Sequence, residues 1–431
     1  MSEPEPADLS IYDRLHWSDE QLTELLASGA QRRELQAYFG HADYERLAGL
    51  ARFRAVHRGR APRPRVYVIP GILGSELGIP RPAPWPPDLL WLDAIDIIRG
   101  RLTELGLDAP RGVVPLGVLP TTYLPLRLEL EAAGCDVVMH AYDWRRSILD
   151  AGHELGERLA ADPAPAIHVV AHSMGGLVAR AALRHAGGAR IARLITVATP
   201  HRGALAPLQA LRGTYPVVRR LAALDLRHDA GQLAHEVFST FPSLYEMLPP
   251  AGAMGELDLF DPSSWPAGQP APDPDLLRAA RALTAGLAPL DARCVAIVGV
   301  GQRTVIGVER EQEEFRYAVS GAGDGTVPAS SAAATGIDHY YFRCEHSELT
   351  RSGTVARALL DLIARGATGR LQRSSALAHQ PAISVTDADL RRVYNDKVDW
   401  HALSPEARRI YLQRLNEPPP QYLRRAARRG R

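Results

Sequence analysis

The stretch that most constrains how this chain folds is Ile167 to Leu177, which reads IHVVAHSMGGL. An apolar run typical of a buried strand ends at Ser173, and two glycines then open a helical pattern. A serine on a strained turn between a strand and a helix is a nucleophile elbow, which lifts the hydroxyl clear of the sheet. Alanine replaces the first glycine of the G-x-S-x-G form, and its small side chain still suits the tight turn.

Other apolar runs resemble this strand, and helical patterns separate the first of them. The expected strands cover 66–69, 137–141, 167–171, 191–197, 294–300 and 340–343. Helical patterns at 146–160 and 177–185 lie between consecutive strands, as β-α-β crossovers require. The sequence therefore predicts an α/β fold with a mostly parallel sheet.

The pattern divides the chain into three parts. We expect a helical extension over residues 1–60 and the α/β domain over residues 61–369. Two proline-rich stretches, about 76–126 and 204–290, interrupt the alternation and are expected to be insertions that cover an active site as a cap or lid. Residues 370–431 are expected to form a second helical extension that ends in a basic tail.

The N-terminal extension carries clear helix signals. Ser18 and Gln21 form a capping box before an apolar stripe, and Gly29 is placed to end that helix. Because the extension holds no chemical motif, we expect its helices to pack on the main domain, with docking of a protein partner as the alternative. The basic run 424–431 is expected to be solvated, with an acidic partner or an anionic membrane as the alternative contact.

Charge and cysteine content exclude some classes of function. The chain has 50 basic and 49 acidic residues and a net charge of +1, so nothing favours nucleic acid as a partner. Its 3 cysteines lie far apart and suit reduced thiols better than a disulfide framework. The acidic first residues lack the pattern of a secretory signal, and no apolar run is long enough to span a membrane. We therefore expect a cytoplasmic protein, either free or peripheral to a membrane.

Serine at its ordinary pKa is a weak nucleophile, so Ser173 requires a histidine base and a carboxylate that orients the histidine. In α/β sheets with a nucleophile elbow the chain order is serine, acid, histidine. Asp324, within Gly-Asp-Gly, and His346, within Glu-His-Ser-Glu, follow Ser173 in that order. The sequence therefore predicts Ser173, Asp324 and His346 as a catalytic triad.

Other residues compete for two of these roles. Asp338 lies close before its strand and Asp143 precedes the serine, so each fits the acid position less well. His201 follows the strand after the elbow and His339 begins a strand, so each is a weaker candidate for the base. Asp324 itself has an alternative role, because Gly-Asp-Gly forms a good loop without any catalytic function.

A serine mechanism also needs two backbone N–H donors aimed at the developing oxyanion. One should come from the residue after the nucleophile, Met174. The other should come from the glycine-containing loop after the first strand, residues 70–75, which reads PGILGS.

Several short motifs together resemble the lecithin:cholesterol acyltransferase family, which includes phospholipid:diacylglycerol acyltransferases and lysosomal-type phospholipases A2. They are PGILGSEL at 70–77, AYDWR at 141–145, AHSMGG at 171–176, ATPHRG at 198–203, FPSLYEMLP at 241–249, GDGTVP at 323–328 and EHSEL at 345–349. Their joint order, over roughly residues 65–364, is more specific than any single motif. The resemblance implies an α/β-hydrolase fold and the same triad.

The resemblance also implies roles for individual residues. It implies that Ile72 and Met174 are the oxyanion donors. It implies that Asp143, Trp144 and Arg145 support the site from behind. The substrate that it implies is an acyl ester of a lipid.

We therefore expect a serine acyltransferase or lipase that forms an acyl-enzyme on Ser173 and needs no cofactor. The alternatives are a carboxylesterase or triacylglycerol lipase without transferase activity, and an inactive hydrolase scaffold that binds partners through its helical ends. A metal site is a minor alternative. It would use Asp225, His228, Asp229 and His235 in the second insertion, which a solvated helix face explains equally well.

Trp85, Leu89, Leu90 and Trp91 directly follow the oxyanion loop. An insertion at that position rims the acyl pocket, and tryptophan favours interfaces, so we expect these residues to form a partly exposed apolar surface that meets lipid. A buried core patch is the alternative. The stretch 76–126 has no cysteine, whereas animal members of the family carry a disulfide there, so a lid in this chain would be held by packing alone.

Overall fold

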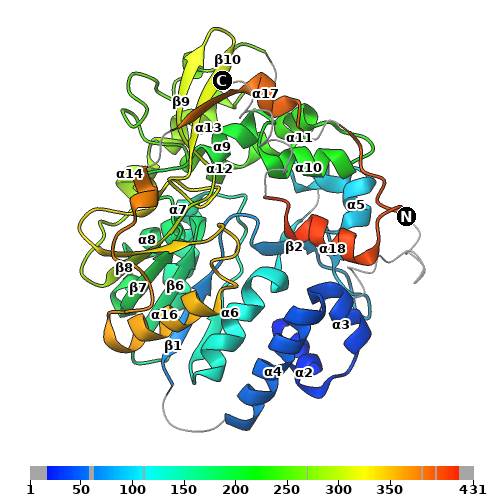
Figure 1. Cartoon of the computed structure of the whole chain (residues 1–431), viewed down its shortest axis with the longest axis vertical. Helices are drawn as coiled ribbons and strands as arrows, with labels where there is room; N and C mark the ends of the chain where they lie inside the picture. Colours follow the sequence, from blue (N-terminus) through cyan, green and yellow to red (C-terminus); the bar gives the residue numbers. More distant parts are fainter. Residues whose placement is uncertain are drawn as a thin grey trace.

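The computed structural model describes residues 17–57, 63–109, 112–268, 270–379, 382–393 and 396–416. A six-stranded parallel sheet in the order β11-β8-β7-β6-β1-β5 forms its centre (Figure 1). Its strands are β1 (Arg65–Ile69), β5 (Asp136–Met139), β6 (Ile167–His172), β7 (Ile191–Val197), β8 (Cys294–Val300) and β11 (Asp338–Arg343). The predicted α/β class is confirmed, and each predicted strand is present.

Alternate residues of the central strands feed two apolar cores, one on each face of the sheet. The flanking helices are α6 (Pro120–Ala132), α7 (Ile148–Ala161), α8 (Met174–Ala182) and α16 (Gly353–Arg365). Tyr67 and Ile69 of β1 join the core that includes α7 and α8. Val66 and Val68 join the core that includes α6 and α16. Burial on both faces explains why β1 reads as a continuous apolar run.

The first insertion contains a small antiparallel sheet in the order β3-β2-β4. Its elements are β2 (Ser75–Ile79), β3 (Asp88–Leu89), α5 (Ala94–Ile98), η2 (Arg101–Leu105) and β4 (Val114–Val118). Asp93 caps α5 by accepting a hydrogen bond from Ile95 N–H (2.8 Å). Arg101 binds the carboxylates of Asp88 (2.8 Å) and Glu104 (2.9 Å). These contacts order a segment that its prolines would otherwise leave irregular.

The second insertion, between β7 and β8, is made of helices. They are α9 (Ala206–Leu211), α10 (Pro216–Leu224), α11 (Ala230–Glu236), η4 (Phe238–Thr240), α12 (Pro242–Glu246), η5 (Pro262–Ser264), α13 (Pro274–Ala280) and α14 (Leu283–Gly286). Other short helices, outside this insertion, are η3 (Ala186–Arg190), α15 (Ala329–Ala332) and η6 (Ala376–His379). Phe241 of the insertion is fully buried, so this segment belongs to the main core.

A hairpin precedes the Asp324 loop. It consists of β9 (Thr304–Glu311) and β10 (Glu314–Ser320), which pair antiparallel. A third strand, β12 (Ile383–Thr386), pairs with β10 and comes from the C-terminal extension. The extension thus completes a second sheet, in the order β12-β10-β9.

Three helices of the N-terminal extension pack beside α6 (Figure 1). They are α2 (Asp19–Ser28), α3 (Arg32–Phe39) and α4 (His41–His57). The predicted capping box of Ser18 and Gln21 is present, and Gly29 ends α2 in the left-handed conformation. Leu124 and Leu128 of α6 share the small apolar core of these helices.

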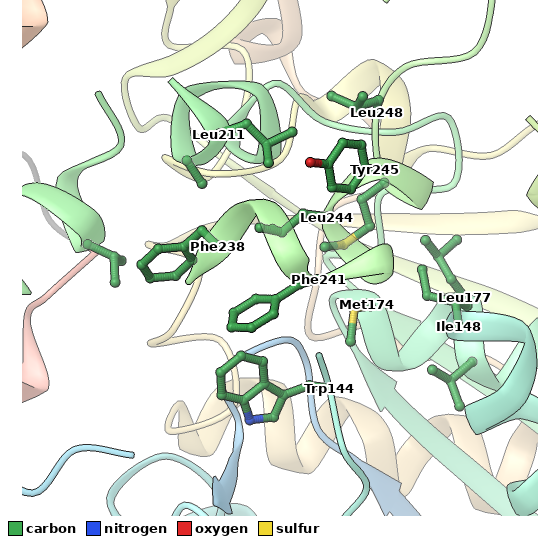
Figure 2. Packing of buried hydrophobic residues seen from close by; sticks show 14 of the residues in the cluster. Trp144, Ile148, Met174, Leu177, Leu211, Phe238, Phe241, Leu244, Tyr245 and Leu248 are labelled. Atoms are coloured by element: carbon green, nitrogen blue, oxygen red, sulfur yellow. The ribbon is translucent and has the colours of Figure 1, made fainter. Parts of the chain in front are cut away.

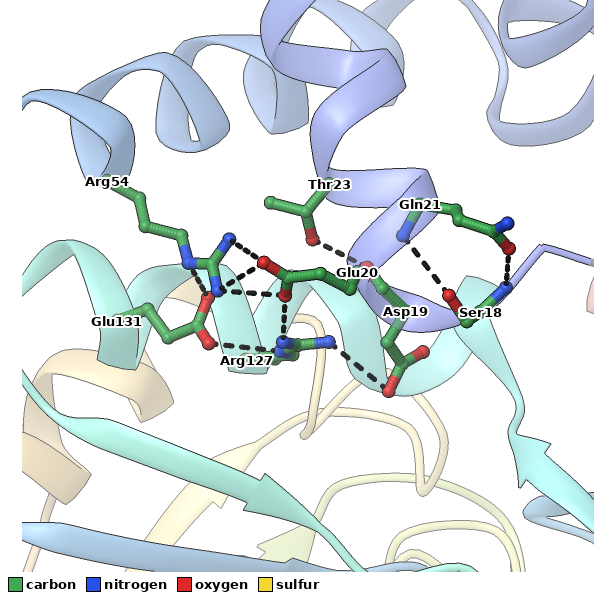
Figure 3. A network of polar contacts seen from close by, with 8 residues as sticks. All are labelled: Ser18, Asp19, Glu20, Gln21, Thr23, Arg54, Arg127 and Glu131. Atoms are coloured by element: carbon green, nitrogen blue, oxygen red, sulfur yellow. Dashed lines mark hydrogen bonds and ion pairs between the residues drawn. The ribbon is translucent and has the colours of Figure 1, made fainter. Parts of the chain in front are cut away.

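A network of charged side chains also joins these helices to α6 (Figure 3). Arg127 of α6 reaches Asp19 (3.4 Å) and Glu20 (3.0 Å) of α2. Arg54 of α4 binds Glu20 (3.0 Å) and Glu131 of α6 (2.6 Å). The two arginines therefore connect three helices through partly buried charges, which fixes their relative position.

The C-terminal extension contributes α17 (Asp387–Arg391) and α18 (Pro405–Gln413). Asp387 is fully buried, accepts a hydrogen bond from Tyr317 of β10 (2.7 Å) and pairs with Arg212 (3.3 Å). Helix α18 packs on α3, so the two extensions touch each other. The predicted basic tail 424–431 lies outside the described residues.

Within the described ranges, no helix is both long enough and apolar enough to cross a bilayer. All three cysteines are free thiols, with Cys135 and Cys294 buried and Cys344 partly buried. Burial raises the pKa of each thiol, which disfavours the reactive thiolate.

Glu76 of β2 is buried, and this burial, with a smaller contribution from the charge of Asp19, raises the pKa of its carboxyl to about 8. Since the ordinary value is 4.5, the unfolded chain releases a proton that the folded chain keeps, and stability should fall as the pH rises from 4.5 to about 8. Glu76→Gln should flatten this part of the profile and raise the unfolding temperature near pH 8. Thermal unfolding of both proteins across that range measures the effect, and parallel profiles would contradict it.

Candidate active site

Ser173 lies on the turn between β6 and α8 with φ 53° and ψ −129°, a backbone conformation that residues with a side chain avoid. Its N–H donates to the Val197 carbonyl at the end of β7 (2.8 Å). A Cβ at Gly175 would lie 2.4 Å from the Pro70 carbonyl oxygen, so only glycine lets α8 begin this close to β1. The geometry is that of a nucleophile elbow.

Three predicted residues form one hydrogen-bonded chain. The Nε2 atom of His346 lies 2.9 Å from Ser173 Oγ, and its Nδ1 atom lies 2.7 Å from Asp324 Oδ2. Because a carboxylate only accepts, Nδ1 carries the proton and Nε2 is left to accept the serine proton. All three side chains are nearly buried, with 5%, 8% and 2% exposure for Ser173, His346 and Asp324. This arrangement is that of a serine hydrolase triad.

The loop around Asp324 holds the carboxylate in place. Its Oδ1 atom accepts hydrogen bonds from the N–H groups of Thr326 (3.0 Å) and Val327 (2.7 Å). The Asp324 carbonyl accepts from His346 N–H (2.9 Å), which joins the two loops by their backbones. One oxygen of the Asp324 carboxylate therefore stabilises the turn, while the other contacts the His346 ring.

The competing residues are used elsewhere. Asp338 pairs with Arg373 (3.1 Å), and Asp143 pairs with Arg145 (2.7 Å). The His201 ring contacts Thr196 Oγ1 (3.1 Å), and burial lowers the pKa of that ring to about 3. His339 is hydrogen-bonded to the Ile337 carbonyl (3.3 Å). The structure brings none of the four into hydrogen-bonding contact with Ser173.

The proposed oxyanion loop passes directly over the serine. A Cβ at Gly71 would lie 2.8 Å from Ser173 Cβ, so glycine is required for this approach. Ile72 follows Gly71 and lines the same cavity as Ser173, and Met174 begins α8. In the part of the chain that the structure describes, neither the Ile72 nor the Met174 N–H donates a hydrogen bond to another group. Both N–H groups are therefore free to receive a negatively charged oxygen.

A hydrogen-bonded chain that the sequence did not reveal supports this loop. Gly71 N–H donates to Tyr123 Oη (2.8 Å), Tyr123 Oη lies 2.9 Å from His172 Nδ1, and His172 Nε2 lies 3.2 Å from the His346 carbonyl. The carbonyl only accepts, so His172 Nε2 carries the proton and Tyr123 must donate to Nδ1. Burial, and then the neighbouring His346, lower the pKa of His172 well below its ordinary value, in keeping with a neutral ring. The chain connects the oxyanion loop, the elbow and the triad histidine.

Asp143, Trp144 and Arg145 do not touch the triad. Arg145 binds Asp143 (2.7 Å) and donates to the carbonyls of Leu105 (2.9 Å) and Val113 (3.1 Å). Arg145 is only 4% exposed. Through these hydrogen bonds it connects the segment after β5 to both sides of the first insertion. The segment holds the insertion in place.

Trp144 makes the corresponding contact with the second insertion. Its Nε1 donates to the Ser75 carbonyl (3.0 Å), and its ring packs edge-on against Trp91 and Phe241. Figure 2 shows Trp144 below Phe241, with Met174 of the elbow nearby. The Trp144 carbonyl also accepts from Ser243 Oγ (2.7 Å). One buried indole therefore joins the loop after β1 to both insertions.

The expectation of an exposed lipid-binding surface at Trp85, Leu89, Leu90 and Trp91 is wrong for three of its four residues. Leu89, Leu90 and Trp91 are 6%, 1% and 2% exposed, and only Trp85 is partly exposed. The physical reason is that Trp91 has partners inside the protein, since its Nε1 donates to the Leu73 carbonyl (2.9 Å). The core-patch alternative describes these three residues.

Three of the four residues of the minor metal alternative form local contacts within their own segment. Asp225 accepts from Arg227 N–H (2.7 Å) and contacts the His228 ring (2.9 Å), and Asp229 caps α11. Among the described residues, no group of three or more histidine, cysteine or acidic side chains is arranged to hold a metal ion.

A cavity of about 160 Å³ adjoins Ser173 and His346. Its walls are mostly apolar and come from the oxyanion loop, both insertions and the end of α18. Tyr215 of the second insertion and Asn416 after α18 supply polar atoms at its edge. The C-terminal extension therefore contributes to the site, which the sequence analysis did not anticipate.

Comparison with known proteins gives a partial family match. A model described as a PGAP1-like alpha/beta domain matches residues 149–236, which include the elbow. No match is found among curated proteins. The α/β-hydrolase fold follows from the sheet order and the elbow.

Solved structures with similar folds are distant from this chain. A Bacillus licheniformis lipase, BlEst2 in mature form, has 13% identity, a TM-score of 0.39, and coverage of 71% of this chain and 94% of its own. A chain of the Tle4–Tli4 complex has 13% identity, a TM-score of 0.42 and coverage of 71% and 99%. An alpha/beta hydrolase from Novosphingobium aromaticivorans has 14% identity, a TM-score of 0.26 and coverage of 71% and 91%.

The hydrogen bonds of Tyr123 lead to a testable prediction. Tyr123→Phe should lower kcat for a small ester by about tenfold or more, because it leaves Gly71 N–H and His172 Nδ1 without their partner. Tyr67→Phe is a matched control, because it also removes a buried hydroxyl. Tyr67 lies on β1, the strand that precedes the oxyanion loop, and its hydroxyl is bonded to Asp162 (2.7 Å). Steady-state kinetics and thermal unfolding separate the two effects. Equal kcat losses in both variants would show that Tyr123 only stabilises the fold.

Proposed function

We propose that the protein is a serine-dependent lipase or acyltransferase that acts on acyl esters of lipids through an acyl-enzyme on Ser173. The observation that carries this proposal is the continuous chain from Ser173 Oγ through the His346 ring to the Asp324 carboxylate. The apolar wall of the adjoining cavity supports an acyl group as the part of the substrate that binds there.

The reaction divides into two transfers. Ser173 Oγ attacks the ester carbonyl carbon while its proton passes to His346 Nε2. The bond from the acyl carbon to the leaving oxygen then breaks, and His346 returns the proton to that oxygen. In the second transfer water or an alcohol gives its proton to His346 and attacks the acyl carbon, and Ser173 Oγ leaves and recovers the proton.

The charge that forms on the carbonyl oxygen needs a prepared site. We propose that the N–H groups of Ile72 and Met174 receive it, since both belong to backbone segments held rigidly around Ser173. Asp324 keeps the His346 ring in the tautomer that can accept the serine proton and stabilises the imidazolium that forms. Asp143, Trp144 and Arg145 act at a distance, by holding the insertions that close the site.

Two features support transfer to an alcohol beside hydrolysis. Both insertions contribute walls to the cavity at Ser173, and a water-poor site favours a bound alcohol over bulk water. The motif order, which resembles lecithin:cholesterol acyltransferases, points to the same reaction. A carboxylesterase or triacylglycerol lipase without transferase activity is the second candidate, because the triad serves both reactions equally.

Ser173→Ala should abolish labelling by a fluorophosphonate probe and turnover of esters while it leaves the fold intact. The reason is that, among the described residues, Ser173 Oγ is the hydroxyl hydrogen-bonded to His346 Nε2 (2.9 Å). Gel fluorescence, ester kinetics and circular dichroism measure the three properties. Turnover that survives in a folded Ser173→Ala protein would rule out the serine mechanism.

Asp324→Asn should lower kcat by orders of magnitude, because an amide lets the His346 ring adopt the wrong tautomer. Asp338→Asn is the matched control, since Asp338 lies on β11 and pairs with Arg373 at the surface. If the control lost activity and Asp324→Asn did not, the acid would be misassigned.

Product partitioning tests the transferase proposal. With a fixed phospholipid donor, increasing amounts of a long-chain alcohol or diacylglycerol should divert product from free fatty acid to acyl ester. Chromatography of the extracted lipids measures the ratio. If free fatty acid remained the sole product at saturating acceptor, the lipase without transferase activity would be the correct function.

A further inference from the structure

A second cavity, of about 480 Å³, lies next to the one at Ser173. It is formed where the two terminal extensions meet the first insertion: α3, the segment around β3 and α5, and α18 with the residues before it all contribute walls. The residues that line both cavities are Trp91, Leu92, Leu119, Leu412 and Gln413. The two cavities are therefore adjacent and share these lining residues.

Size distinguishes what each cavity can hold. Sites for drug-sized ligands typically have volumes of roughly 300 to 1,000 Å³. The cavity at Ser173, at about 160 Å³, has room for the reacting ester group and little more. The second cavity, at about 480 Å³, falls within the usual range. Of the two, the second cavity therefore has the volume that a long acyl chain requires.

The wall of the second cavity suits hydrocarbon. The polar atoms of several lining side chains are already bonded within the protein: Trp91 Nε1 to the Leu73 carbonyl (2.9 Å), and Arg408 Nε to the Trp400 carbonyl (2.9 Å). Arg409 binds Gln413 (3.0 Å). What remains toward the cavity is largely apolar, from Ala37, Leu89, Leu92, Ile95, Leu119 and Leu412.

Glu76 is also compatible with a hydrocarbon ligand in this cavity. It lines this cavity and is buried, and its raised pKa, about 8, keeps the carboxyl uncharged at neutral pH. An uncharged carboxyl does not oppose an apolar ligand as a carboxylate would.

We propose that the second cavity holds the hydrocarbon tail of the acyl group whose carbonyl is bound at Ser173, and that Leu412 and Gln413 of α18 border its path. This inference rests on the proposed function and names the part of the substrate that the extensions recognise. A long acyl chain is the occupant of matching chemistry. The length of acyl chain that the site accepts is thereby set in part by residues of the two terminal extensions.

Helix α18 is anchored well enough to act as a wall. Tyr411 Oη donates to the Arg220 carbonyl of α10 (2.9 Å), and Asn416 Nδ2 donates to Thr326 Oγ1 (2.8 Å), two residues after Asp324. Asn416 also accepts a hydrogen bond from Tyr215. The wall is thus tied both to the second insertion and to the loop that carries the triad acid.

Filling the cavity from α3 tests the proposal, because α3 does not line the cavity at Ser173. In the full chain, Ala37→Phe should reduce the ratio of kcat/KM for p-nitrophenyl laurate to that for p-nitrophenyl acetate by at least about tenfold, as expected if two or more methylenes lose their burial. Ala37→Leu should give a smaller reduction. Arg33→Phe adds the same ring at an exposed position of α3 outside the cavity and should leave the ratio unchanged.

The outcomes separate this proposal from the function on which it rests. An unchanged ratio in folded Ala37→Phe and Ala37→Leu proteins, with Ser173 still labelled by a fluorophosphonate, would overturn the tail site and leave the serine mechanism standing. Equal reductions in Ala37→Phe and Arg33→Phe would also overturn it, because a ring anywhere on α3 would then suffice. Turnover in Ser173→Ala would refute the mechanism itself.

Discussion

The backbone of Ser173 is the constraint on which the rest of this structure depends. A residue with a side chain at φ 53° and ψ −129° stores conformational strain that only the surrounding structure can hold. Three neighbours hold it: β7 accepts the Ser173 N–H, the end of β1 fits closely against Gly175, and the oxyanion loop passes over the serine at Gly71. Strands, helix and loop are therefore placed by their contact with one turn.

Much of the fold and of the triad could be predicted because those signals are local. The strands buried on both faces read as continuous apolar runs, and the elbow and the Asp324 loop each lie within a few residues. The order serine, acid, histidine then needs no knowledge of distances. The capping box at Ser18 and the αL residue at Gly29 are local in the same sense.

The features that were missed depend on partners far apart in the sequence. Tyr123 of α6 meets Gly71 and His172, which lie about 50 residues away on either side, and nothing near Tyr123 in the sequence indicates these contacts. From its residue type Trp91 is expected at an interface, but in the structure its indole N–H donates to the Leu73 carbonyl. Strand β12 is too short and too exposed to be recognised without its partner β10. Residue type alone cannot show which partner is present.

The contribution of α18 to both cavities also bears on the order of events when the chain is made. Synthesis proceeds from the N-terminus, so the sheet, the elbow and His346 leave the ribosome before residues 405–413 of α18 and Asn416 after it. Contacts that bridge so much sequence form late, because the entropy of closing a long loop must be overcome first. A nascent chain would thus have its elbow formed before α18 completes the wall of the second cavity. If the second cavity holds the acyl tail as proposed, selectivity for the tail is complete only after α18 has been made.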